Sequence, residues 1–275
     1  MYPTRSELLE KIRFDEQSVP GATLNDLSEP LWHRFATDRT SDTRDDLLQK
    51  LAMAHDDDGV LRPTVAGILM GTVEPRIFLP NAYIQAVAYR GTTTVPEGDA
   101  VYQLDAQDIV GPVDRQIQQA VQFVKRNMRT MARKTGGRTD VPQFDLAAVF
   151  EAVTNAAAHR DYSIYGSKIR LRLFDDRLEI SSPGAIPNTM TVESMPFRQS
   201  ARNEALTSLL ARCPTSEDAD TTHRTYIMDK RGEGVPLILE RSRKLSGRTP
   251  TYRVIDDSEL LLVIYSATEN SASLN

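Results

Sequence analysis

The fold is decided by the run Glu151-Ala-Val-Thr-Asn155-Ala-Ala-Ala-His159-Arg160-Asp161-Tyr162, which lies within a longer stretch from Phe144 to Pro187. Placed on an α-helix, at about 100° per residue, the run has two different faces. Apolar side chains form one face, and they belong to Leu146, Val149, Phe150, Val153 and Ala157. Glu151, Asn155 and His159 form a ridge on the opposite face. The spacing therefore predicts a helix with a core side and a polar ridge.

The residues around this ridge are small. Alanines flank it, and no Lys or Arg occurs from Asp145 to His159. A solvent-exposed helix face ordinarily carries charged residues such as Lys and Glu. Small neighbours therefore indicate that something packs closely against the ridge. The alternative is that the polar side chains are hydrogen-bonded within an ordinary protein interior, and the helix alone does not decide between the two.

A β-hairpin and a glycine-containing loop follow the helix. Residues 168–174 alternate in polarity, Asp175-Asp176 forms a tight turn, and residues 177–181 alternate again, as expected for a hairpin. The second strand runs into Ser182-Pro183-Gly184-Ala185-Ile186-Pro187. A positive φ angle at Gly184 would let a ligand approach the backbone there.

The order of these parts resembles the GHKL (Bergerat-type) ATP-binding fold. More narrowly, the string EAVTNAAAHRDYSIYGSKIRLRLFDDRLEISSPGAIP is similar to the C-terminal, HATPase_c-like domain of bacterial RecG-related helicases and transcriptional regulators. Those proteins usually carry a Schlafen/AlbA-type DNA-binding domain at the N-terminus. The resemblance implies an α+β fold class, with a GHKL-type α/β sandwich preceded by a smaller α+β, winged-helix-like region.

The resemblance also implies a role for each site residue. Asn155 corresponds to the metal ligand that holds Mg²⁺ against the triphosphate of ATP. Glu151 corresponds to the acid that activates the attacking water in members that hydrolyse ATP. The other cofactor-binding residues that it implies are His159, Arg160, Ser182, Gly184, Ile186, Gly232 and Gly234. The last two lie at the mouth of a predicted helix, where backbone N–H groups and the positive dipole end suit a polyphosphate.

The base-binding loop departs from the GHKL pattern. That loop normally has an Asp and then Gly-x-Gly, whereas this chain has Ser182 in place of the Asp and lacks the second Gly. Adenine specificity is therefore open at this point, and Glu151 permits hydrolysis without establishing it. Helicase activity is excluded because no Gly-x-x-x-x-Gly-Lys-Ser/Thr loop occurs.

Two functions follow from these observations. The first is a Mg-ATP-binding module of a DNA-linked transcriptional regulator or defence protein, with slow ATP hydrolysis as its enzymatic form. The second is a non-catalytic regulatory or dimerisation scaffold that keeps the fold without nucleotide hydrolysis. A homodimer is a further hypothesis that the resemblance suggests, because GHKL proteins often pair through elements near the nucleotide lid.

The composition narrows the class of protein. The chain has 275 residues, 40% of them hydrophobic and 26% charged, as in globular proteins of one or two domains. No run approaches the roughly eighteen apolar residues of a membrane helix, and the start lacks a signal-peptide core. The single Cys213 suits a reducing cytoplasm. With a net charge of −5, DNA contact would need a separate domain, a local patch or a partner.

We expect four segments along the chain. Residues 1–41 resemble an extension after a Schlafen/AlbA-type domain that is mostly missing, residues 42–140 form a connecting region, residues 141–268 form the GHKL-like domain, and residues 269–275 fray. Within them we predict helices over residues 6–13, 44–54, 63–70, 108–131 and 204–212, and strands within 77–103, 249–255 and 259–265. Residues 125–134 are interpreted as a solvated basic helix end, 135–142 as a linker, 188–203 as the nucleotide lid, and 214–224 as a polar connection.

Overall fold

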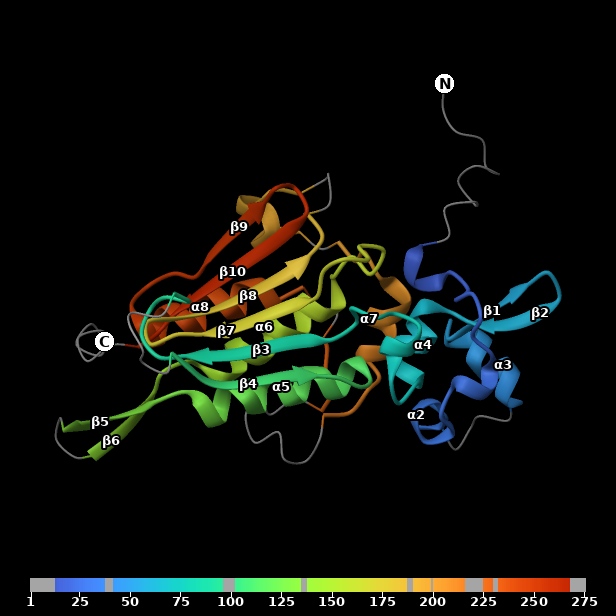
Figure 1. Cartoon of the computed structure of the whole chain (residues 1–275), viewed down its shortest axis with the longest axis horizontal. Coiled ribbons are helices and arrows are strands. Elements are labelled where there is room, and N and C mark those ends of the chain that lie inside the picture. Colours follow the sequence, from blue (N-terminus) through green and yellow to red (C-terminus); the bar gives the residue numbers. More distant parts are fainter. Residues whose placement is uncertain are drawn as a thin grey trace, which may run out of the picture.

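The computed structural model describes residues 13–37, 42–95, 102–134, 138–186, 190–198, 200–215, 225–229 and 232–267. Its main part is a six-stranded sheet with helices on one face, and a smaller α+β region lies beside one end of the sheet (Figure 1). This mixed architecture confirms the fold class predicted from the sequence.

The strands of the sheet come from three separate parts of the chain. Their order is β4-β3-β7-β8-β10-β9. They are β3 (Ile84–Tyr89), β4 (Gln103–Ile109), β7 (Ile169–Leu173), β8 (Arg177–Pro183), β9 (Thr251–Ile255) and β10 (Glu259–Tyr265). β3 and β7 pair in parallel and the other neighbours are antiparallel. The hairpin predicted after the deciding helix is confirmed, and so are the two last strands.

Helices α5 (Val113–Asn127), α6 (Leu146–Ala158) and α8 (Gly234–Ser246) cover one face of the sheet (Figure 1). α6 is the deciding helix of the sequence analysis, and it packs between α5 and α8. It begins at Leu146 because the Asp145 carboxylate accepts a hydrogen bond from the N–H of Ala148 at 2.9 Å. Val149, Phe150, Val153 and Ala157 are buried and Leu146 is half-buried, so the predicted core side of the helix is confirmed.

The smaller region is joined to the sheet part by buried polar contacts. It contains α2 (Glu29–His33), α3 (Arg44–Lys50), β1 (Ala54–Asp57), β2 (Val60–Pro63), α4 (Val65–Gly71) and the 3-10 turns Phe14–Glu16, Leu24–Asp26 and Pro75–Ile77. Arg34 donates to the Asp114 carboxylate at the start of α5, at 2.7 and 3.0 Å. The buried Asp15 carboxylate accepts from the N–H of Leu206, at 3.1 Å, in α7 (Glu204–Leu210). The smaller region therefore supports both α5 and α7.

The helix predicted over residues 44–54 is wrong in its C-terminal part. α3 ends at Lys50, and Ala54–Asp57 pairs with Val60–Pro63 as a hairpin. Asp58 and Gly59 have positive φ angles of 53° and 80°, which suit a two-residue hairpin turn. The next helix starts at Val65 instead of at residue 63, because Thr64 caps it by accepting from the N–H of Gly67 at 3.0 Å.

The helix predicted over residues 108–131 is too long at both ends. Ile109 closes β4, and α5 ends at Asn127. After it, β5 (Thr130–Lys134) and β6 (Arg138–Pro142) pair as a hairpin, where a basic helix end and a linker were predicted. The side chain of Asn127 donates to Asp105 at 2.8 Å, and this contact on neighbouring β4 accompanies the end of the helix.

The remaining predictions fall partly outside the described residues. Residues 6–12 of the first predicted helix, most of the 214–224 connection and the 269–275 tail lie there. Part of the predicted lid is the 3-10 helix η4 (Val192–Phe197). β3, β4 and α5 precede residue 141 and yet belong to the sheet and its helical layer, so the predicted connecting region contributes to the main part of the fold.

Candidate functional site

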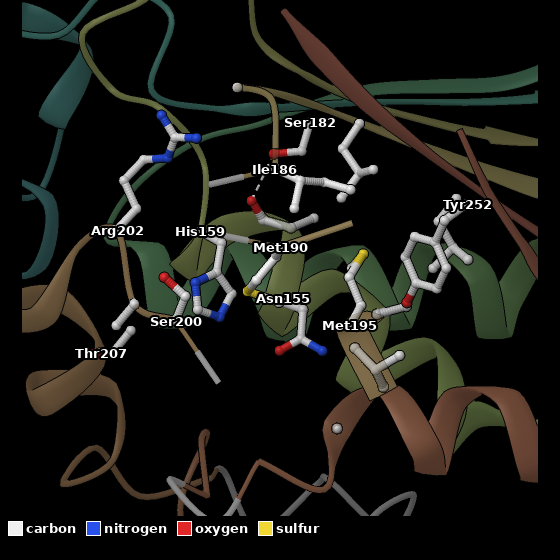
Figure 2. Close-up of a pocket in the computed structure, with 18 of the residues that line it drawn as sticks. Asn155, His159, Ser182, Ile186, Met190, Met195, Ser200, Arg202, Thr207 and Tyr252 are labelled. Atoms are coloured by element: carbon white, nitrogen blue, oxygen red, sulfur yellow. Dashed lines mark hydrogen bonds between the residues drawn. The ribbon is translucent and has the colours of Figure 1, made fainter. Parts of the chain in front are cut away.

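A cavity of about 550 Å³ opens between α6, the sheet and the segment that contains η4 and α7. Figure 2 shows its labelled side chains, which come from elements far apart in the sequence. The predicted site residues that line it are Glu151, Asn155, His159, Ser182, Gly184, Ile186, Gly232 and Gly234. The polar ridge of α6 therefore faces a cavity, together with its small neighbours Ala152 and Ala156.

At one end of the cavity, α8 begins directly beside the polar ridge of α6. A Cβ atom on Gly234 would lie 2.2 Å from Oε1 of Glu151 and 2.9 Å from Nδ2 of Asn155. Those distances are shorter than any real Cβ contact, so a residue with a side chain does not fit here without displacing Glu151. We call this place the α8 end of the cavity. Its glycine lets the N-terminus of a 13-residue helix approach both polar side chains.

Glu151 is nearly enclosed at this end. Its exposed fraction is 3%. Tyr252 of β9 also lines the cavity, and burial together with the charge of Glu151 raises the pKa of the Tyr252 phenol. Tyr252 therefore stays protonated at neutral pH beside the carboxylate.

Asn155 offers a ligand for a hard cation. Among the residues that the structure describes, none hydrogen-bonds to its side-chain amide, which faces the cavity (Figure 2). In the same part of the chain, no group of three or more His, Cys, Asp or Glu side chains is placed to hold a metal ion. Mg²⁺ usually keeps several waters and takes substrate phosphates with one or two protein oxygens. A single amide oxygen would fit that chemistry if a polyphosphate were bound beside it.

At the other end of the cavity lie the last two residues of β8 and the three residues that follow them, which we call the base loop (residues 182–186) after the loop that they resemble. Gly184 has a φ angle of 112°, as the sequence predicted. Its N–H donates to the carbonyl of Ser258 at 2.6 Å, and the carbonyl of Pro183 accepts from the N–H of Asp161 at 2.7 Å. The hydroxyl of Ser182 donates to the carbonyl of Ala156 at 2.8 Å. With its proton used in this way, the Ser182 oxygen can offer only lone pairs to a ligand.

His159 ends α6 on the cavity side. Burial and the positive charge of Arg202 lower its pKa from 6.5 to about 4. The imidazole is therefore neutral near pH 7. It can exchange hydrogen bonds with a ligand, but it adds no positive charge for phosphates.

Arg160 does not line the cavity, so the structure does not bring it to the other predicted site residues. Its guanidinium donates to the carbonyl of Ser167 at 2.6 Å and lies over the ring of Tyr162, 4.7 Å from the centroid. The next residue after the C-cap of a helix points in a different direction from the ridge, and here it points into the protein, where it is 2% exposed. The prediction that Arg160 contacts phosphates therefore has no support in this arrangement.

Several cavity residues were missed by the sequence analysis. They include Met190, Met195, Arg198, Arg202, Asp229 and Tyr252. The segment around the first four has no periodicity in the sequence, and nothing in the pattern singled them out. Arg202 lines the cavity, whereas Arg160 does not.

The comparisons with known proteins agree with this fold. Residues 166–264 match a family model described as "Putative ATP-dependent DNA helicase recG C-terminal". The matched segment runs from just before β7 almost to the end of β10, so it contains the base loop and Gly234 but not α6. A comparison with the curated proteins gives no match.

Among solved structures, the chain is similar to the crystal structure of the DIP2311 protein from Corynebacterium diphtheriae, a target of the Northeast Structural Genomics Consortium. The TM-score is 0.64 at 20% identity, over 95% of this chain and 49% of that one. The chain thus spans about half the length of that protein, and the likeness shows the fold alone. The fold is a GHKL-like α+β fold. The segment 166–264 is similar to the RecG-related C-terminal family.

Proposed function

We propose that the cavity binds ATP together with Mg²⁺. The observation that carries this proposal is the contact at the α8 end, where a helix N-terminus without a Cβ atom meets Glu151 and Asn155. Backbone N–H groups and the dipole of α8 favour an anion at this place. The family description that matches residues 166–264 names an ATP-dependent enzyme, which supports the same ligand.

Each end of the cavity has its own part in this proposal. Asn155 would hold Mg²⁺ against the phosphates, and the bound ion would neutralise their negative charge. Gly232 and Gly234 would let the backbone approach the phosphates. The base would lie toward the base loop, where the Ser182 oxygen, whose proton is donated to Ala156, would accept a hydrogen bond from an exocyclic amino group such as that of adenine.

If the protein is an enzyme, the reaction that it catalyses under this proposal is ATP hydrolysis. Glu151 would orient the attacking water and accept its proton, because it is the carboxylate that lies at the α8 end beside Asn155. In this form, the protein would be a slow ATPase linked to DNA through a separate domain or partner, in a transcriptional regulator or a defence protein.

A second candidate is a non-catalytic scaffold, in which the same fold serves regulation or dimerisation. The observation that favours it is the absence of a carboxylate at position 182, since a serine hydroxyl makes a weaker hydrogen bond with an amino group than an Asp would. A homodimer that forms with or without nucleotide would serve this candidate, and light scattering after size exclusion would measure it.

The test of the first proposal is calorimetric titration of Mg-ATP into wild type and Asn155→Ala. We expect wild type to bind, and the variant to bind about tenfold more weakly with Mg²⁺ and equally without it. Gln85→Ala is the control, because it removes an amide from β3 outside the cavity. No heat from ATP, ADP or GTP at about 1 mM, the weak end of ordinary affinities, would overturn nucleotide binding.

Turnover separates the two candidates once binding is established. Phosphate release by wild type that is lost in Glu151→Gln, with Mg-ATP affinity retained, would support the ATPase. Binding without release in wild type would favour the scaffold.

A further inference from the structure

Arg202 joins two parts of the cavity wall. One guanidinium nitrogen, Nη1, donates to Oδ2 of Asp161, and the other, Nη2, donates to the carbonyl oxygen of Ala185. Asp161 lies just after α6, and Ala185 lies in the base loop. The arginine therefore bridges the end of the helix that carries Asn155 and the loop that follows β8.

The base loop is packed closely against this bridge. A Cβ atom on Gly184 would lie 2.8 Å from Cβ of Asp161 and 3.3 Å from Cζ of Arg202. Asp161 also holds the loop through its backbone, since its N–H donates to the carbonyl of Pro183 at 2.7 Å. Hydrogen bonds from Asp161 and Arg202 thus hold Pro183 and Ala185, the two residues on either side of Gly184.

The backbone next to Arg202 is anchored as well. The side-chain amide of Asn203 is buried and donates to the carbonyls of Ala158 and Arg160, at 2.9 and 2.8 Å. Asp161 is also held, because its Oδ1 accepts from the N–H of Ser163 at 3.0 Å. Both partners of the Arg202–Asp161 ion pair are therefore pre-positioned, which lowers the entropy cost of holding the loop.

The contacts of Arg202 also indicate which part of a ligand it affects. Its Nη1 and Nη2 atoms are directed at Asp161 and Ala185, and the Asp161 carboxylate balances its charge. Two of the five N–H groups of this guanidinium are used in these contacts and its charge is already paired, so Arg202 offers a phosphate less than an unpaired arginine would. Figure 2 shows Arg202 on one side of the cavity and Tyr252, the neighbour of Glu151, on the other.

We propose that Arg202 is a positioning residue for base recognition: it clasps the base loop to Asp161 and so sets the affinity for the base of a nucleotide, while the α8 end sets the affinity for its phosphates. This inference rests on the proposed function. It adds a determinant of specificity that lies 20 residues beyond Ser182 in the sequence.

The test compares two ligands and two matched arginines. Titrations of Mg-ATP and of Mg-tripolyphosphate into wild type, Arg202→Ala and Arg170→Ala separate the base from the phosphates. Arg170 is the control because it forms a similar half-buried ion pair, with Glu259, outside the cavity; its side chain is 35% exposed and that of Arg202 is 28% exposed. A ligand-free readout is hydrogen exchange at the N–H groups of Asp161 and Gly184, which the loop protects.

We expect Arg202→Ala to lower the affinity for Mg-ATP by about tenfold, which is the effect of one charge-assisted contact. The affinity for Mg-tripolyphosphate should stay within about twofold of wild type. Exchange at Asp161 and Gly184 should become faster in Arg202→Ala and stay unchanged in Arg170→Ala. An equal loss for both ligands would overturn the inference, because Arg202 would then act on phosphates. Unchanged Mg-ATP affinity in Arg202→Ala would overturn it too. Failure of wild type to bind either ligand would instead overturn the proposed function.

Discussion

The two ends of the cavity are built in different ways. At the α8 end, Gly234 of α8 lies directly against the side chains of Glu151 and Asn155 of α6, with no side chain of its own between them. At the base loop, short polar contacts hold the chain: backbone hydrogen bonds from Asp161 and Gly184, and the Arg202 bridge. A side chain added at Gly234 must displace Glu151 and Asn155 together, whereas the hydrogen bonds of a loop can be lost one at a time.

This difference predicts different responses to substitution. A change at the α8 end should act on binding as a whole, since it moves the residues that hold the metal and the phosphates together. A change in the base loop should lower affinity by a smaller amount, and mainly the part of the affinity that comes from the base.

The largest effect is expected for Gly234→Val. The new side chain would start 2.2 Å from Oε1 of Glu151, so either the carboxylate or α8 must move. Overpacking of this kind costs about 1–3 kcal/mol and would misplace Asn155, so we expect Mg-ATP affinity to fall by about a hundredfold. Calorimetric titration of the purified variant measures the loss.

Gly166→Ala is the control for this substitution. It lies within the same matched segment, and a Cβ atom there would meet nothing within 4 Å. It should bind Mg-ATP as wild type does. Normal affinity in Gly234→Val would mean that the contact between α6 and α8 does not shape the ligand site, and the contrast between the two ends would disappear.

A smaller effect is expected for Gly184→Ala in the base loop. The residue would have to keep a φ angle of 112° and would place its Cβ 2.8 Å from Cβ of Asp161. Strained backbone conformations cost about 1–3 kcal/mol, so we expect the free energy of unfolding to fall by about 2 kcal/mol. We expect Mg-ATP affinity to fall by about tenfold, with tripolyphosphate affinity nearly unchanged.

Gly91→Ala separates strain from crowding in this prediction. Gly91 has a φ angle of 82° but has open space where a Cβ would lie. Urea denaturation should show a loss of about 1 kcal/mol for Gly91→Ala, from backbone strain alone. If Gly184→Ala costs no more than Gly91→Ala, the packing of the base loop on Asp161 contributes nothing to its conformation.

Much of the fold around the site could be predicted from the sequence, because short segments of the sequence determine it. The helix with two faces, the hairpin after it and the start of α8 at a Gly-x-Gly all follow from spacing within short windows. The hairpin β1–β2 was also visible in principle, since Asp58-Gly59 is a strong two-residue turn signal between strands.

The β5–β6 hairpin and the place of β3 and β4 in the sheet were harder to predict. Which strands pair is decided by contacts between distant segments, such as Ala86 of β3 beside Leu171 of β7. Site residues divide in the same way. Those on the ridge of α6 and at the glycines follow from motifs, whereas Arg202 depends on a partner, Asp161, that lies 41 residues away. A local sequence pattern cannot predict such a pairing.

The last prediction concerns His159, which ends α6 beside Arg202 and acts on stability and not on ligand affinity. Its pKa is about 4 in the folded protein, against 6.5 ordinarily, because burial and the Arg202 charge disfavour the imidazolium. Below pH 6.5 the unfolded chain takes up a proton that the folded chain does not. The contribution of His159 to stability is therefore fully present above pH 6.5 and is lost as the pH falls toward 4, by at most about 1.4 kcal/mol per pH unit.

His159→Gln should lack this part of the pH dependence, and urea denaturation of both proteins at about pH 7, 6 and 5 measures the difference. Carboxylates titrate in both proteins and cancel in that difference. Parallel curves would mean that the folded chain protonates His159 normally, and that this side of the cavity is open to water instead of closed by the Arg202 bridge.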